Sequence, residues 1–229
     1  MAINVKDILN QMMVYINEYD ADLNNPDAFE QETAADLQAH IDAAARMVAQ
    51  VAPSNLQEAT NEDVNITLTK RPDNRYYGAG TLPTDYMRLI YIVSEKLYRP
   101  ITQLLPATHP TYNMQYCPIE GFGAGEYAPI GYQVDGAFEI HSFKAPEDGD
   151  GETESSEQET ETIQMSYLTL PAVSGSGDNA QYQTLKPELT DVIAMQAAAL
   201  YLGMNDSGKA AQAQQMASGM LNGIINNEE

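Results

Sequence analysis

The chain has 229 residues, 43% of them hydrophobic, which is enough for a large domain with its own core. Its formal net charge of -22 disfavours binding to nucleic acid phosphates, because such binding requires many Lys and Arg side chains. A single cysteine excludes an intrachain disulfide framework, and three scattered histidines disfavour a histidine-rich metal site.

The N-terminal part of the chain predicts two helices. Residues 4–19 carry apolar side chains at the i, i+3, i+4 spacing of one helix face, with Asn4 as the capping residue. Residues 30–51 are rich in Ala, Gln and Glu, and Pro53 ends this second helix. The first residues lack the features of a secretion signal, so we expect synthesis in the cytoplasm.

The middle of the chain predicts strands. Residues 64–69 alternate apolar and polar side chains, and residues 86–93 form an apolar segment that fits a strand buried on both faces. Residues 97–105 fit a second strand or an extended segment, and Gly136 fits a hairpin turn within residues 130–143. We expect residues 163–170 to pair with residues 138–143 as a long hairpin.

An acidic run would form the tip of that hairpin. Residues 147–161 contain eight acidic side chains and no basic one, which predicts a flexible, self-repelling loop over residues 145–162. The glycine-rich run at residues 121–125 is not predicted to bind phosphate. No Lys follows it, and Pro129 breaks any helix that could present its N-terminus there.

The C-terminal part predicts two more helices, the first capped by Thr184, with Pro187 in its first turn and its end at Gly203. The expected fold class is therefore α+β: a helical bundle from residues 4–52 and 184–225, with a central β-rich insertion at residues 64–170 and a projecting acidic hairpin loop. Residues 1–229 would form one domain.

The sequence contains no catalytic motif of a known kind, so we expect no enzyme activity, cofactor or metal. Cys117 is expected to be an inert thiol. Arg88 lies inside the apolar segment 86–93 and needs a carboxylate or carbonyl partner. Arg88, Asp85 and Tyr86 are therefore the predicted structural anchor of this segment.

Three segments resemble the head–tail adaptor proteins of tailed bacteriophages, the ring proteins seated beneath the portal. Residues 82–89, LPTDYMRL, are similar to the family's element of leucine-proline, acid, aromatic and arginine-leucine. Residues 167–171, YLTLP, resemble its returning strand, and residues 187–202 resemble its penultimate helix. The Met-, Gln- and Ala-rich helices also resemble connector proteins of phages of gut Bacteroidetes, including crAss-like phages.

The resemblance implies a homo-oligomeric ring of twelve copies in the virion, at the head–tail junction, made in the host cytoplasm. The ring would bind the portal protein on one side and the neighbouring tail ring protein on the other. Genomic DNA would pass through its lumen without specific binding. The apolar side chains of the last helix would contact the portal or a neighbouring subunit, or else pack within their own bundle; they are Met216, Met220, Leu221, Ile224 and Ile225.

Three alternatives remain open from the sequence. The first is another tail completion or gatekeeper ring protein, which the sequence barely separates from an adaptor. The second is a carboxylate-dependent hydrolase, which would need a concave pocket with perturbed carboxylates. The third is an acidic DNA mimic, which would need carboxylates spaced like phosphates over a folded face.

Overall fold

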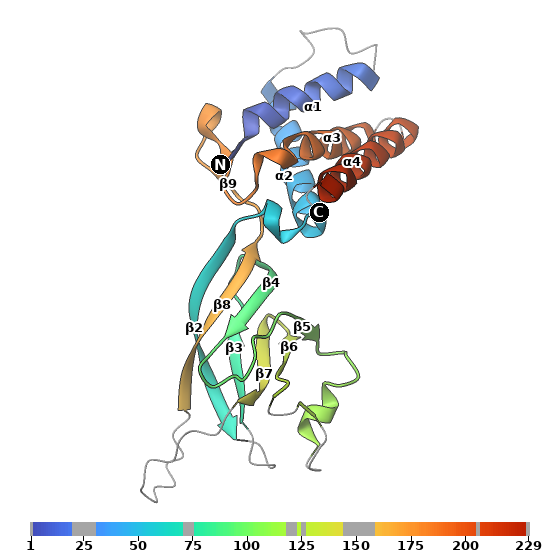
Figure 1. The fold of residues 1–229 in the computed structure, drawn as a ribbon. Helices are drawn as coiled ribbons and strands as arrows, with labels where there is room; N and C mark the ends of the chain where they lie inside the picture. The colour runs from blue at the N-terminus through green and yellow to red at the C-terminus, as the bar shows by residue number, and fades with distance from the viewer. Residues whose placement is uncertain are drawn as a thin grey trace, which may run out of the picture. The chain divides into compact units, whose positions relative to one another are not determined.

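The computed structural model describes residues 2–19, 31–70, 76–117, 123–124, 127–143, 159–204 and 207–227. The chain forms two compact units, drawn in Figure 1. The helical unit combines Met1–Glu58 with Thr169–Glu229, and the β unit is Ala59–Leu168. The β unit is thus inserted, along the sequence, between the two halves of the helical unit.

The helical unit is arranged around one central helix. Its α-helices are α1 (Val5–Tyr19), α2 (Gln31–Val51), α3 (Thr190–Leu202) and α4 (Ser207–Asn227). The other three helices all contact α3. Among the described residues, no helix combines the length and the apolar character that crossing a membrane requires.

Burial extends around the whole circumference of α3. Its residues 192–199 are all buried, a run of more than two helical turns. A helix that is apolar on every side belongs in the interior of a protein. The alanines of this run, such as Ala194, Ala197 and Ala198, keep the helix thin, so neighbouring helices can approach it closely.

The predicted capping of these helices is partly confirmed. The Asn4 side chain accepts a 2.8 Å hydrogen bond from the Lys6 backbone N–H, so it caps α1. The predicted cap at Thr184 is wrong: its hydroxyl makes no hydrogen bond to the described residues, and a 3₁₀ turn at Pro187–Leu189 leads into α3 instead. Gly203 follows the end of α3 and donates to the Ala199 carbonyl at 3.0 Å.

A small three-stranded sheet completes the helical unit. Its strands are β1 (Ile3–Asn4), β10 (Gln181–Tyr182) and β9 (Val173–Ser174), all antiparallel to their neighbours. The Tyr182 hydroxyl donates a hydrogen bond to Asp42 of α2. This bond ties the small sheet to the helices.

The β unit contains a seven-stranded mixed sheet in the order β4-β8-β2-β3-β7-β6-β5. The bridge between Ile92 in β4 and Ile101, just before β5, brings the two edge strands together and nearly closes the sheet. Strands β5 and β6 pair in parallel. The strands are β2 (Ala59–Lys70), β3 (Tyr76–Thr81), β4 (Tyr86–Val93), β5 (Leu104–Pro106), β6 (Ile130–Val134), β7 (Ala137–Phe143) and β8 (Glu159–Thr169).

This sheet encloses its own hydrophobic core. Ile66, Phe138, Ile140 and Ile163 are at most 1% exposed and lie at its centre. The remaining buried members come from the same strands β2, β7 and β8, from β4 and from the segment between β4 and β5: Leu68, Leu89, Ile92, Leu97, Ile101, Phe143, Met165 and Tyr167.

The predicted helical bundle carrying a β-rich insertion is therefore wrong. The strands form a large, nearly closed sheet with a core of its own, and they are not an excursion from a bundle. The longest pairing joins β2 to β8 and brings Ala59 opposite Leu168, positions more than a hundred residues apart in the chain. Local sequence patterns identify strands but do not encode such distant partners.

The predicted acidic hairpin is also wrong in its pairing. Strand β7 lies between β3 and β6, whereas β8 lies between β2 and β4, so these two strands are not neighbours (Figure 1). Residues 159–161 of the acidic run belong to β8, and residues 147–158 lie outside the described part of the chain. The turn predicted at Gly136 is confirmed. Asp135 (φ 43°) and Gly136 (φ 81°) join β6 to β7 in the left-handed conformation that Asp-Gly favours.

We predict that Gly80→Ala destabilises the protein by about 1–3 kcal/mol, because two rigid neighbours occupy the position of the new methyl group. A Cβ at Gly80 would lie 2.8 Å from Cζ of Phe138 and 2.9 Å from Cγ2 of Ile66. Urea unfolding followed by tyrosine fluorescence measures the change. The matched control is Gly219→Ala on the exposed side of α4, where a Cβ meets nothing within 4 Å. It should gain about 1 kcal/mol from helix propensity. Equal losses in both variants would contradict the steric explanation.

Candidate functional site

The segment at residues 82–89 forms a tight turn followed by β4. The Leu82 backbone N–H donates to the Gly136 carbonyl at 3.0 Å, and Tyr86 donates to the Pro83 carbonyl at 3.1 Å. Pro83 presets the backbone for a turn, and the β-rich residues after it continue as a strand. The strand predicted at residues 86–93 is confirmed with these bounds, but its expected burial on both faces is wrong, because only Leu89 and Ile92 are buried and its other residues are half-buried.

Two of the predicted anchor residues contact a distant strand. The Tyr167 hydroxyl of β8 lies 3.3 Å from an Asp85 carboxylate oxygen and 3.2 Å from Glu62, so it can donate to either one. The ring of Tyr86 lies 5.9 Å from the ring of Tyr167. Burial, followed by the Asp85 and Glu62 carboxylates, raises the pKa of Tyr167 well above its ordinary value. Tyr167 therefore stays protonated and holds the turn onto β8.

The third predicted anchor residue, Arg88, is half-buried in β4. The next residue, Leu89, is 8% exposed and belongs to the core of the β unit. The structure thus brings Asp85 and Tyr86 together with Tyr167, and it places Arg88 in the same strand as Tyr86.

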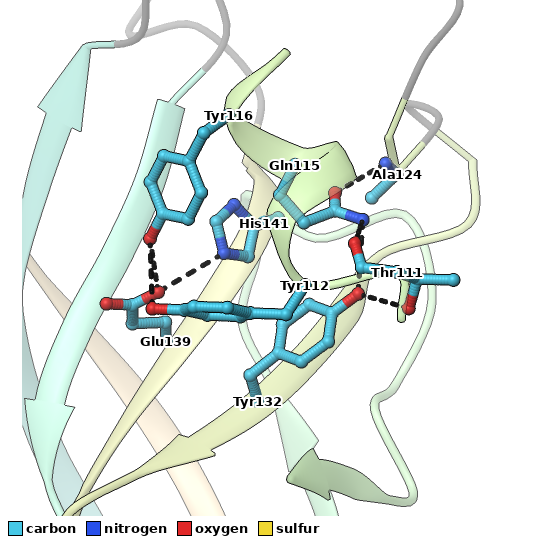
Figure 2. A network of polar contacts seen from close by, with 8 residues as sticks. All are labelled: Thr111, Tyr112, Gln115, Tyr116, Ala124, Tyr132, Glu139 and His141. Carbon is cyan, nitrogen blue, oxygen red and sulfur yellow. Dashed lines mark hydrogen bonds and ion pairs between the residues drawn. The ribbon is translucent and has the colours of Figure 1, made fainter. Parts of the chain in front are cut away.

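A second cluster covers the outer face of strands β3, β7 and β6. The Cα–H of Gly78 and Gly80 face the core residues Ile66 and Phe138, so Tyr77, the residue before Gly78, faces outward. Glu139 and His141 share that outer face on β7. The Tyr112 and Tyr116 side chains, at the 3₁₀ helix Asn113–Tyr116, point toward them (Figure 2).

His141 is the centre of this aromatic cluster and is fully buried. Its ring is stacked on Tyr77 at 5.6 Å, and the rings of Tyr116 and Tyr132 meet it edge-on, each also at 5.6 Å. Its Nε2 lies 3.5 Å from a Glu139 carboxylate oxygen. The three tyrosine rings and the carboxylate therefore enclose the imidazole.

A β-bulge makes this arrangement possible. Tyr77 pairs with His141 and Tyr76 pairs with Phe143, so Ser142 is the extra residue of the bulge. Ser142 has a φ of 81°, and its hydroxyl donates to the Ala124 carbonyl at 2.7 Å. The bulge lets His141 face the outer cluster while Phe143 still reaches the core.

The Glu139 carboxylate is the acceptor of the cluster. The Tyr116 hydroxyl donates to it at 2.5 Å, and the Tyr112 hydroxyl lies 3.5 Å from that of Tyr116. Burial, followed by the hydrogen bond to Glu139, raises the pKa of Tyr116 far above its ordinary value. The hydrogen bond with Tyr116 acts to lower the pKa of Tyr112, but burial and the charge of Glu139 outweigh it and the pKa is raised.

Gln115 fastens residues 111–116, the segment that covers the outer face of the sheet and is called the covering segment below, to strand β6. It is 1% exposed, and its amide nitrogen donates to the Tyr132 hydroxyl at 3.1 Å and to the Thr111 carbonyl at 3.0 Å. Its amide oxygen accepts from the Ala124 backbone N–H at 2.6 Å. Figure 2 shows Gln115 between Thr111, Tyr132 and Ala124, with each of these contacts directed at its amide.

The chemistry of this cluster is hydrogen bonding that holds the covering segment in place. Phenols with raised pKa values remain protonated at neutral pH, so Tyr112 and Tyr116 act there as donors and do not take up protons. Within the described residues, no group of three or more His, Cys, Asp or Glu side chains could hold a metal ion. The described geometry therefore supports a structural role for the cluster.

Not all of the predicted interface residues of α4 are exposed to solvent. Leu221 is buried at 8% exposure, and Met216 is 44% exposed. Met220, Ile224 and Ile225 are half-buried. The apolar side chains of α4 therefore serve partly to contact α3, with Met216 extending the apolar surface outward.

A cleft of 170 Å³ opens beside α4 in the helical unit. Its floor includes Val192 and Gln196 of α3, and Met47 and Val51 of α2 are exposed at its rim to 42% and 65%. None of its lining residues is charged; the others are Val48, Gln214, Ala217, Ser218 and Leu221.

Sequence reasoning did not identify Gln115, Tyr132, Glu139 or His141 as members of one cluster. The alternation within residues 137–143 places Glu139 and His141 on one face of a strand, and this signal was available. The bulge at Ser142 and the return of the 3₁₀ helix onto the sheet depend on tertiary contacts that leave no local signal.

Comparison with known proteins gives no assignment: no family model matches the chain, and no curated protein matches it.

We predict that Gln115→Leu destabilises the protein by about 1–3 kcal/mol, because it removes the hydrogen bonds of a buried amide while keeping its approximate volume. It should also speed hydrogen exchange at the Ala124 amide, which loses this acceptor. Exchange followed by NMR, together with urea unfolding, measures both effects. The control is Gln133→Leu, an exposed glutamine on β6. Unchanged exchange at Ala124 in Gln115→Leu would show that Gln115 does not fasten the segment.

A second prediction concerns alkaline pH. The folded state keeps the Tyr116 proton above pH 10.0, where the unfolded chain loses it, so the free energy of unfolding falls as pH rises through this range. Tyr116→Phe lacks the phenol, and its stability should decline less steeply above about pH 10. Urea unfolding at a series of pH values measures the slope. The control is Tyr127→Phe, at a tyrosine that is 63% exposed. If both variants keep the wild-type slope, Tyr116 does not contribute to it.

Proposed function

We propose that the protein is a structural subunit of a bacteriophage head–tail adaptor ring, which binds beneath the portal, extends the DNA channel and links the capsid to the tail. The observation that carries this proposal is a contact between two of the segments that resemble the adaptor family. Asp85 and Tyr86 of residues 82–89 contact Tyr167 of residues 167–171, although Asp85 and Tyr167 are 82 residues apart. Two of the three segments that carry the resemblance are thus in contact in the β unit.

The third resembling segment supports the same proposal. Residues 187–202 comprise the 3₁₀ turn Pro187–Leu189 and helix α3, and α3 is the helix on which the other three depend for burial. All three segments therefore coincide with elements that define the fold. A chance similarity of short motifs would be expected to fall on exposed, replaceable positions as often as on such elements.

The charge of the chain suits a DNA conduit. A formal net charge of -22 repels the phosphate backbone, so DNA can pass without adhering to the wall. A ring also needs lateral contacts between subunits, and apolar side chains exposed at the cleft beside α4 provide a surface for them.

Electron microscopy of the purified protein tests the proposal. We expect annular particles with a central channel and about twelve subunits, either alone or after mixing with the portal protein encoded in the same genome, because adaptor rings are closed cyclic oligomers. A protein that stays monomeric and does not bind the portal would contradict the proposal.

A DNA-retention assay gives a second readout of the same proposal. The protein should not shift duplex DNA in a gel even at low salt, where electrostatic attraction between a basic protein and DNA would be strongest. Tight binding to duplex DNA would be incompatible with a channel through which the genome slides.

A further inference from the structure

Helix α4 is nearly uncharged in a strongly acidic chain. Its 21 residues contain no Asp or Glu and one Lys, Lys209, whereas the whole chain carries a formal net charge of -22. Surface helices normally place charged side chains on their solvent face, yet the exposed positions of α4 hold Gln, Asn, Ser, Ala, Gly and Met. Copies of an acidic chain repel one another, so a neutral surface is where two copies can touch.

The cleft on one side of α4 shares this neutrality and exposes apolar side chains to water. Val51 is 65% exposed and Met47 is 42% exposed at its rim. Exposed apolar groups that flank a cleft favour burial against a partner, because removing apolar area from water is favourable.

The opposite side of the same helix carries a matching apolar surface. Residues two positions apart on an α-helix lie about 160° apart around its axis, so Met216 lies on the side opposite Gln214 and Ser218 of the cleft. Met216 is 44% exposed, and the half-buried Met220 follows one turn later. Methionine side chains are flexible and fill irregular apolar spaces well.

We propose that the methionine side of α4, Met216 and Met220, docks into the cleft between α2 and α4 of a second copy of the chain. The contact joins two different surfaces, so it is head to tail: in a pair of copies, one cleft and one exposed methionine side remain available to further copies. Repeated head-to-tail contacts produce closed rings or open filaments, whereas a contact of one patch with itself stops at a dimer. The inference rests on the proposed function and assigns the subunit contact of the ring.

Two charge variants test the contact separately. Val51→Glu places a carboxylate at the cleft rim, and Met216→Glu places one on the docking side. Each variant alone should raise the dissociation constant of self-association at least about tenfold, since the carboxylate must be desolvated without a partner. The control is Val14→Glu on α1, at an apolar residue that is 47% exposed and lies outside both surfaces. It should assemble like the wild type.

Mixing the two variants gives the decisive measurement. Met216→Glu retains an intact cleft and Val51→Glu retains an intact methionine side, so an equimolar mixture should form one-to-one dimers that grow no further. Sedimentation equilibrium over a concentration series distinguishes monomer, dimer and ring, and circular dichroism verifies that each variant is folded.

Three outcomes would overturn the inference: variants that assemble like the wild type, a mixture that remains monomeric, or a wild-type chain that is monomeric at every concentration. Rings that form in electron micrographs but tolerate both substitutions would leave the proposed function standing and remove this contact. A wild-type assembly that is sensitive to both substitutions but does not bind the portal would support this contact and contradict the proposed function.

Discussion

The helical unit depends on the burial of α3 on every side. Because α3 occupies the centre, each of the other three helices can bury one face against it and must leave another face outside. The N-terminal and C-terminal parts of the chain are thereby held in one core, although the whole β unit separates them in sequence. The cleft beside α4 follows from the same arrangement, since α3 forms its floor and α2 and α4 form its sides.

The β unit is stabilised differently, by a sheet that nearly closes around a small core. Its edge strands meet through the bridge between Ile92 and Ile101, and this bridge covers part of an edge that could otherwise pair with another chain. The turn at Asp85 is held onto β8 by Tyr167, and the segment before β6 is held onto the outer face by Gln115. Both fastenings use hydrogen bonds from groups that stay neutral, so they impose no requirement for a buried ion pair.

Much of the secondary structure could be predicted from local patterns. The i, i+3, i+4 spacing identified α1 together with its cap at Asn4, and the β-rich run at residues 86–93 identified β4. The pairing of β8 with β2 could not be predicted, because it depends on a register set between segments about a hundred residues apart. The residues that surround His141 could not be predicted either, for a related reason. The bulge at Ser142 and the fold of the covering segment decide which side chains reach it.

The two glycines of β3 limit which substitutions the β unit can accept during evolution. Gly78 and Gly80 leave the core side of β3 without side chains, and Phe138 and Phe143 occupy that volume. The core volume next to these two strands is thus filled mainly from β7, which carries the aromatic rings, while β3 carries glycines there. A larger residue on β3 is tolerated only where Ile66 of β2 and the neighbouring ring on β7 leave room for it. In diverging sequences these positions are expected to vary together, as compensated exchanges of volume between β3 and the two strands beside it.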